Sequence, residues 1–499
     1  MRWAKSEVCS MRRSNKPPAS ADRRRFIKYA GAAGVAGLAG LAGCSSDDAS
    51  GGGENGSDGG GDGGEQETTG RDAGEETTSG EDTSASGEET TGGERTASDE
   101  ETTAGGGNES EGGTTSGSAG GSTEEILIGS NHPLSGSLAS TGVGMHNAIE
   151  LAAKRKNEAG GIESLGGAQV RVLKGDNQGQ QELGGQVTQD LIDEGAKVVS
   201  GCFASPVTTA ATQVAERRQT PFVISIAAAT DILQGRGFNY VYRPQPPAQK
   251  MAEDYANLVP EVIRQNGSEI KTAGLFYVSN SYGQSIKESL RKFLPENDVE
   301  VVAETAIELG ASSANTQVSK LKQADPDTVI ATTYVPGGVT LANAMQNQSY
   351  RPPHLTACAS ATFTDGASVS DIGEFANGVL DNNYALNPTV EKTREVREQF
   401  NSAYEGSFSA SVGMAYTAGE VIIEAIEQAG STEREAINGA LQSLTYEDHI
   451  AAMGPITFKE NGENENALAA VNQVQDGTIK VVYPEEFAGA EPIIETSSN

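Results

Sequence analysis

From Glu124 onward, short runs of β-branched residues alternate with amphipathic segments, and this alternation most restricts the folds open to the chain. The run EILIGS at 125–130 precedes a segment whose apolar side chains recur at helical spacing, and VRVLKGD, KVVSG and PFVISI follow in the same rhythm. Strands that alternate with helices form parallel sheets covered by helices. The sequence therefore predicts an α/β fold built on parallel sheets.

The rhythm restarts after VYRP at 241–244 with TAGLFYVS, TVIATTY, HLTAC and GVLDNNY. The roughly 375 residues of this part exceed the size at which a single core usually divides. We therefore expect two lobes, with the chain crossing between them at hinges near Arg243, Asn382 and Gly454. The predicted boundaries are 124–243 with 383–453 for the first lobe, 244–382 with 454–484 for the second, and 485–499 for a tail.

Residues 1–43 are basic and contain the weakly apolar run YAGAAGVAGLAGLAG, which is typical of an export signal. Before this run, RRRFIK at 23–28 resembles a twin-arginine signal, and after it LAGC at 41–44 resembles a lipoprotein box. Cys44 is then the expected mature N-terminus and the site of lipidation. A buried helix rich in Gly and Ala is the alternative.

Residues 44–123 are predicted to be a disordered acidic tether of Gly, Ser, Thr and Glu. From Ser45 the segment holds 20 acidic residues against two basic ones and no aromatic side chain, so it cannot bury enough apolar surface to offset its ordering entropy. Over the whole chain, 69 Asp and Glu stand against 36 Lys and Arg, a net charge of -33. Such a balance argues against nucleic-acid binding and suits solubility in concentrated salt, as in a halophilic protein.

The most informative local feature is GCFASPVTTAATQVAERR at 201–218, which directly follows a predicted strand. Ser205 followed by Pro206 is typical of a helix start. A helix N-terminus at the carboxyl end of a parallel strand faces the ligand crevice and favours an anion. Ser205 is thus a candidate for holding a ligand carboxylate, and a cap that serves only its own helix is the alternative.

Several segments follow one another along the chain in a characteristic order. They include IGSNHPLSGSLASTGVGMHNAIELA, NEAGGI, GCFASPVTTAA, TPFVISIAAAT, VYRPQP, YVSNSYGQS, PDTVIATTY, AYTAGEVIIEAIEQAG and MGPITFKENG. This ordered set resembles the type I periplasmic binding proteins, specifically the branched-chain amino-acid and amide receptors of ABC transporters. The resemblance implies two Rossmann-like lobes joined by three hinge crossings, which close over a small ligand like a Venus flytrap.

The resemblance also implies ligand-binding residues by position. They are Ser205, Ala227, Ala229, Thr230, Tyr282, Tyr334 and Thr141. Ser205 would bind the carboxylate, and the backbone of Ala227 with Ala229 or Thr230 would meet the carboxylate and amine. The loop ending at Thr141 would border the ligand, and the two tyrosines would close over it from the second lobe. The tyrosines could instead be ordinary surface aromatics, and Thr141 a turn residue.

One departure from the family concerns the acid that usually meets the ligand ammonium from the second lobe. The register places Ala359 near that position, and the nearest acid is Asp365, whose surroundings also suit a solvated loop. A buried ammonium without a counter-charge is costly. Either Asp365 or another acid reaches the ligand, or the ligand is not an α-amino acid.

These features predict a non-enzymatic, lipid-anchored monomer on the outer face of the cell membrane. It would deliver a small ligand, a branched-chain or related amino acid, to an ABC permease and its ATPase. A receptor for amides, urea or short carboxylates, or a sensor that signals without transport, is the alternative. No cofactor is expected, because Gly142-Val143-Gly144 lacks the third glycine of a dinucleotide fingerprint. No metal is expected either, and Cys202 and Cys358 are interpreted as buried apolar residues.

Overall fold

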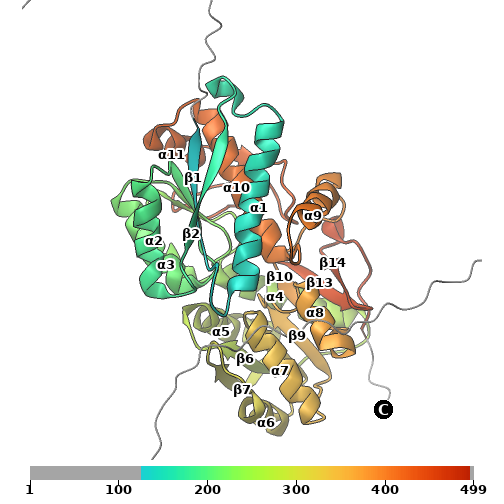
Figure 1. Cartoon of the computed structure of the whole chain (residues 1–499). Helices are drawn as coiled ribbons and strands as arrows, with labels where there is room; N and C mark the ends of the chain where they lie inside the picture. The colour runs from blue at the N-terminus through green and yellow to red at the C-terminus, as the bar shows by residue number, and fades with distance from the viewer. Residues whose placement is uncertain (1–124, 495–499) are drawn as a thin grey trace, which may run out of the picture. The chain divides into compact units, whose positions relative to one another are not determined.

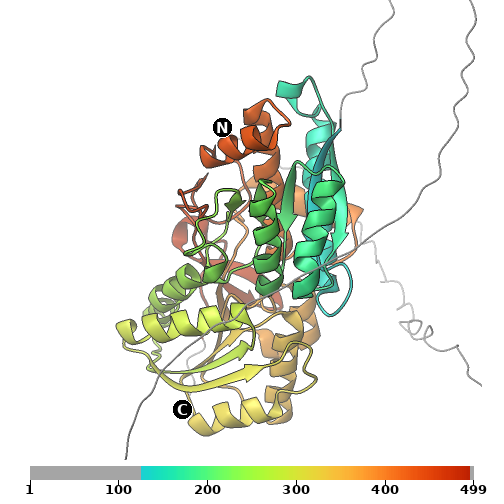
Figure 2. The same cartoon turned by 90° about the vertical axis from the view of Figure 1, so that its left-hand side faces the viewer.

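A computed structural model of the protein describes residues 125–494, which belong to one compact unit. Their helices and strands form two groups, each built on its own β-sheet, and both views show the second group below the first (Figures 1 and 2). The predicted α/β class with parallel-sheet lobes is confirmed. The export signal, the lipidation site and the tether lie outside the described residues.

The first sheet has five parallel strands in the order β2-β1-β3-β4-β5. They are β1 (Ile126–His132), β2 (Val170–Asp176), β3 (Val198–Gly201), β4 (Phe222–Ile224) and β5 (Val241–Tyr242). Its helices are α1 (Ala139–Glu158), α2 (Gln181–Asp193), α3 (Ser205–Arg217), α10 (Ala410–Ala429) and α11 (Arg434–Gln442). Helix α1 packs on α10 and α2 packs on α3, and these pairs cover opposite faces of the sheet (Figure 1).

The second sheet has seven strands in the order β14-β13-β10-β9-β8-β6-β7. They are β6 (Thr272–Val278), β7 (Glu300–Ile307), β8 (Thr328–Thr332), β9 (His354–Cys358), β10 (Leu380–Asn383), β13 (Ala470–Gln475) and β14 (Thr478–Tyr483). Strands β6 to β10 pair in parallel, whereas β13 is antiparallel to both β10 and β14. The sheet is therefore a parallel core extended by an antiparallel hairpin.

The remaining helices are α4 (Ala248–Gln265), α5 (Ser281–Phe293), α6 (Asn315–Ala324), α7 (Val335–Asn347), α8 (Gly366–Ile372) and α9 (Glu391–Ala403). Of these helices, α4 to α8 belong with the second sheet, whereas α9 packs on α1 of the first group. A small antiparallel ribbon joins β11 (Thr445–Tyr446) to β12 (Ile456–Thr457). Every residue of β8 is buried, as expected for a parallel strand that helices cover on both faces.

Gly142 stands in the first turn of α1, close to the loop that follows β1. A Cβ atom at this position would lie 2.0 Å from the carbonyl oxygen of Pro133. Only glycine permits so close an approach without moving the loop. Packing therefore accounts for this glycine.

The chain passes between the two groups at three places, and these segments are hydrogen-bonded to one another. The Arg243 N–H donates to the carbonyl of Gly462, and the Asn387 N–H donates to that of Ile450. Two isolated bridges, Arg243 with Glu463 and Leu386 with Ala451, pair the same segments. Motion about Arg243, Asn382 and Gly454, and the lobe boundaries that depend on it, stay predictions.

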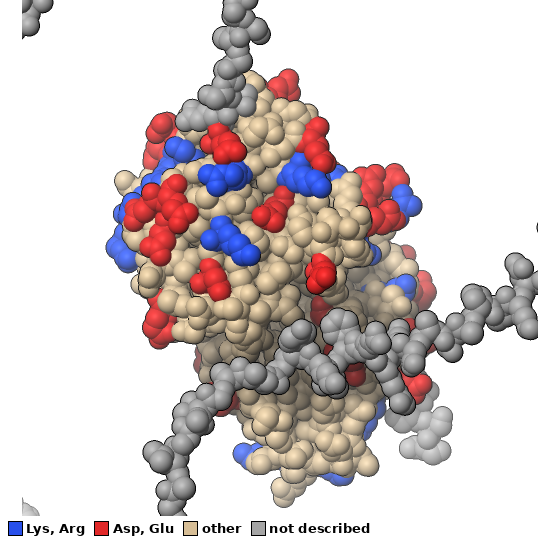
Figure 3. Space-filling model, viewed as in Figure 1, with Lys and Arg blue, Asp and Glu red and all other residues tan. Residues whose placement is uncertain are grey.

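Acidic and basic side chains are interspersed on the face shown in Figure 3. Several form ion pairs, such as Arg218 with Asp193 at 2.7 Å and Arg171 with Glu125 at 2.8 Å. Exposed pairs of this kind stabilise a protein by less than about 1 kcal/mol each. Within residues 125–494, none of the helices has both the length and the hydropathy that a membrane span requires.

Candidate ligand site between the two sheets

A small cavity lies where the carboxyl ends of strands from both sheets meet. Its walls come from the first group (Phe203, Ser205, Ile226, Ala228 and Ser411) and from the second group with the segment after β10 (Tyr282, Tyr334, Ala359, Ala361, Asn383 and Tyr384). Ligands of open α/β sheets bind at this end of the strands. The cavity encloses about 30 Å³, room for roughly two water molecules. A larger guest therefore requires the two walls to separate.

Ser205 is the first residue of α3 and is 1% exposed. The structure corrects one expectation: Ala204 is the N-cap residue, and no side chain caps the helix. The Ser205 hydroxyl instead accepts a hydrogen bond of 3.2 Å from the Ala229 N–H. This hydrogen bond joins the N-terminus of α3 to the loop after β4 at the cavity wall.

Tyr334 approaches the same helix end from the second sheet. Its ring lies edge-on to Phe203 with centroids 5.1 Å apart and packs on Tyr282 at 5.2 Å. Burial raises the pKa of Tyr334 to about 12, although hydrogen bonds from the Asn280 amide and the Ser205 backbone act to lower it. Tyr334 is therefore a neutral phenol whose oxygen lies at the N-terminus of α3.

Tyr282 is buried beside Tyr334 and donates its hydroxyl to the carbonyl of Ala359. Burial is the main reason that its pKa lies well above the ordinary value. Both tyrosines that the sequence singled out thus line the cavity. Their hydroxyl groups are neutral and are hydrogen-bonded to protein atoms.

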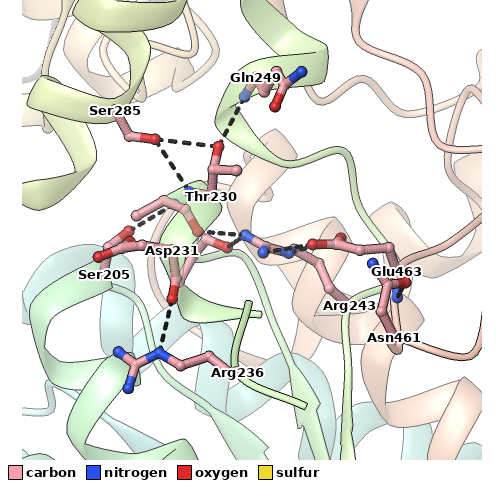
Figure 4. Close-up of polar contacts among 11 residues, drawn as sticks. Ser205, Thr230, Asp231, Arg236, Arg243, Gln249, Ser285, Asn461 and Glu463 are labelled. Carbon is pink, nitrogen blue, oxygen red and sulfur yellow. Dashed lines mark hydrogen bonds and ion pairs between the residues drawn. The ribbon is translucent and has the colours of Figure 1, made fainter. Parts of the chain in front are cut away.

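The segment after β4 lies beside the cavity, and Ile226 and Ala228 are the residues of this segment that line it. Ala227 and Ala229 are buried, and both carbonyl groups accept hydrogen bonds from Arg243. The Thr230 N–H donates to the Ser285 hydroxyl of α5 at 3.1 Å, as Figure 4 shows. Thr230 therefore connects the two groups and does not line the cavity.

Thr141 lies in the first turn of α1 and is half-buried, outside the residues that line the cavity. Asp365 is also occupied elsewhere, since its carboxylate caps α8 by accepting from the Ser368 N–H at 2.8 Å. Ala359 does line the cavity, and its φ of +62° is uncommon for a residue with a side chain. The position near which the family usually carries an acid is thus an alanine in a left-handed conformation, and its carbonyl accepts a hydrogen bond from the Tyr282 hydroxyl.

Sequence reasoning missed Asp381, an acid buried in β10. Its Oδ2 atom accepts from the Asn383 amide at 3.1 Å, whereas its Oδ1 atom has no partner among the described residues. Burial raises its pKa to about 8. An aspartate inside the buried run GVLDNNY was the available signal, because unpaired carboxylates rarely enter a core.

Cys202 and Cys358 are free and buried, which confirms their interpretation as buried apolar residues. Burial raises the thiol pKa of both well above the ordinary value, so neither is a reactive thiolate. Across residues 125–494, no group of three or more His, Cys, Asp or Glu side chains is placed to hold a metal ion.

Two α/β groups with an enclosed cavity between them define a two-lobed ligand-binding protein. Residues 125–478 match the family model described as "Periplasmic binding protein". The chain therefore belongs to the periplasmic binding proteins, which are non-enzymatic. A curated relative is the Leu/Ile/Val-binding protein homolog 8 of Brucella melitensis, 26% identical over 377 residues, which cover 74% of this chain and 92% of the relative.

Solved structures show the same fold at lower identity. The branched-chain amino acid transporter substrate-binding protein LivJ of Streptococcus pneumoniae, in complex with isoleucine, has a TM-score of 0.62 at 20% identity, covering 72% of this chain and 100% of that one. A solute-binding protein of an ABC transporter from R. palustris, in complex with benzoate, has a TM-score of 0.62 at 17% identity, covering 73% and 99%.

Proposed function

We propose that this protein is the solute receptor of an ABC importer and captures a small carboxylate ligand when its lobes close. One observation carries the proposal: buried Ser205, at the N-terminus of α3, and Tyr334 of the second group line the same cavity, and the Tyr334 oxygen accepts a hydrogen bond from the Ser205 backbone. Helix N–H groups and the helix dipole favour an anion. The tyrosine hydroxyl of the second lobe adds a neutral donor.

Branched-chain or related amino acids are the first candidate ligands, because the curated relative is named for Leu, Ile and Val and LivJ was solved with isoleucine. An aromatic or other short carboxylate is the second candidate. It is favoured by the aromatic part of the lining, which comprises Phe203, Tyr282, Tyr334 and Tyr384. Flat rings pack well against such a wall.

The proposed cycle requires the lobes 124–243 with 383–453 and 244–382 with 454–484 to separate and close. The hydrogen bond from the Thr230 N–H to the Ser285 hydroxyl joins the two groups. One neutral hydrogen bond contributes only about 1 kcal/mol net. This bond, the bond between the Ser285 and Thr230 hydroxyls at 3.2 Å and the contact of Tyr334 with Phe203 would all have to break when the lobes separate.

The membrane anchor is a separate part of the proposal, since it depends on residues outside those described. Lipidation of Cys44, after export by a twin-arginine signal, would hold the monomer on the outer face of the membrane beside its permease and ATPase. In the native host, Cys44→Ser should move the protein from the membrane fraction to the medium. Cys9→Ser, inside the signal, should leave it membrane-bound.

A thermal-shift screen of the full chain in concentrated KCl tests the ligand proposal. The probes are L-leucine, L-isoleucine, 4-methylpentanoate, benzoate, acetamide and urea. A ligand that binds only the folded state raises Tm by mass action, and we expect this from at least one carboxylate, with the probe recovered unchanged. Stabilisation by none of the carboxylates, or chemical conversion of the probe, would overturn the proposal.

A further inference from the structure

Among residues 125–494, the charged side chain of Arg243 is the largest that is fully buried, and four hydrogen bonds hold its guanidinium. Its Nε and Nη2 atoms donate to the two carboxylate oxygens of Glu463 at 3.0 and 2.8 Å. Its Nη1 atom donates to the carbonyls of Ala227 at 3.1 Å and Ala229 at 2.9 Å. A planar, forked guanidinium can make both contacts at once, which an ammonium cannot.

The two carbonyl groups belong to peptide units whose N–H groups are those of Ala228 and Thr230. Ala228 lines the cavity, and the Thr230 N–H donates to Ser285 of the second group. Because a peptide unit is planar, a donor that holds its carbonyl also sets the direction of its N–H. Figure 4 shows the guanidinium between Glu463 and the segment that carries Thr230.

Glu463 reaches Arg243 from the chain segment between β12 and β13, the third passage between the groups. This segment lies tightly against β5, because a Cβ atom on Gly462 would stand 2.0 Å from the Val241 carbonyl oxygen. Gly462 also has a φ of +78°, which favours glycine. Arg243 therefore bridges a crossing segment and the loop at the cavity through its side chain.

We infer that Arg243, clamped by Glu463, is a positioning residue that aims the Ala228 and Thr230 peptide groups and so couples the third crossing to lobe closure. The inference rests on the proposed function for its link to ligand affinity. It does not require Arg243 to touch the ligand. Weakening the contact of Arg243 with Glu463, or its contact with the two carbonyls, should let residues 226–230 move and weaken the contact between Thr230 and Ser285.

The test compares Arg243→Lys and Glu463→Gln with Arg434→Lys in the full chain. Arg434 is a matched control, since its Nη2 atom also donates to two carbonyls, those of Ile192 and Ala196, far from the cavity. Amide hydrogen exchange of residues 226–230, measured by mass spectrometry under native conditions, reports the loop directly. Titration calorimetry with L-leucine reports affinity.

We expect either clamp variant to speed exchange in 226–230 and to weaken L-leucine about tenfold, and Arg434→Lys to do neither. Combining Arg243→Lys with Ser285→Ala should add little to the exchange rate, because both act on the same contact. Exchange equal to wild type, or raised as much by Arg434→Lys, or fully additive in the double variant, would overturn the positioning role. If the wild type does not bind L-leucine, the amino-acid assignment fails, whereas the exchange comparison still decides the role of Arg243.

Discussion

The ring of Tyr334, which follows β8, meets the ring of Phe203, which follows β3, with centroids 5.1 Å apart and planes at 67°. The two residues belong to different sheets and are more than a hundred positions apart in the chain. Edge-to-face pairs of this kind contribute about 0.5–1.5 kcal/mol beyond the area that they bury. The contact therefore helps to hold the closed arrangement while also forming a wall of the cavity.

Tyr334→Phe keeps this ring contact and removes the hydroxyl that meets Asn280 and the Ser205 backbone. We expect it to lower the free energy of unfolding by about 1 kcal/mol, the net value of a typical hydrogen bond. Tyr350→Phe is the control, because the buried Tyr350 hydroxyl has no partner among the described residues. Urea unfolding should find the control unchanged or more stable, and equal losses in both variants would contradict the prediction.

Ser205→Ala should weaken a carboxylate ligand by about 1–3 kcal/mol, the cost of leaving a buried polar group one hydrogen bond short. Here that group is the Ala229 N–H, and the loop that it anchors loses its tie to α3. Ser200→Ala, on the preceding strand, removes a buried hydroxyl that bonds the Val223 carbonyl instead. It should lower Tm without changing the dissociation constant, whereas an unchanged constant for Ser205→Ala would remove Ser205 from the site.

The strand and helix rhythm predicted the α/β class and led to Ser205, because both follow from local periodicity and from the rule that ligands meet the carboxyl ends of parallel strands. The same rule could have identified Asn383 and Tyr384, the last two residues of GVLDNNY. It could not identify the Arg243 clamp, since Arg243 and Glu463 are 220 positions apart and meet only through the crossing segments. Nor could it show that Ala204, and not Ser205, is the N-cap residue, a difference of one residue in where the helix begins.

Asp381 should make the protein less stable as pH rises from about 4 to 8. Burial raises its folded pKa to about 8, so over this range the native state binds a proton that the unfolded state has released. The free energy of unfolding then falls by up to about 1.4 kcal/mol per pH unit from this group. Chemical denaturation at several pH values should show a flatter decline in Asp381→Asn. An identical decline in both proteins would mean that Asp381 is ionised in the fold.

His132 should act in the opposite direction at acid pH. It is fully buried between the hydroxyls of Ser130 at 3.0 Å and Ser225 at 2.8 Å, and burial, with a smaller effect of His146, lowers its pKa to about 3. Between pH 6.5 and 3 the imidazole binds a proton in the unfolded state but not in the native state. The free energy of unfolding therefore falls as pH falls through this window.

His132→Gln should therefore flatten the loss of stability below pH 6.5, measured by urea unfolding, even though it is less stable at neutral pH. The same change at His354, which is only half-buried, should leave most of that slope in place. His132 lowers stability as pH falls below 6.5, and Asp381 lowers it as pH rises from about 4 to 8. Replacing His132 should therefore move the pH of maximum stability down, and replacing Asp381 should move it up. Shifts of the same sign in the two variants would show that other titrating groups dominate the pH dependence.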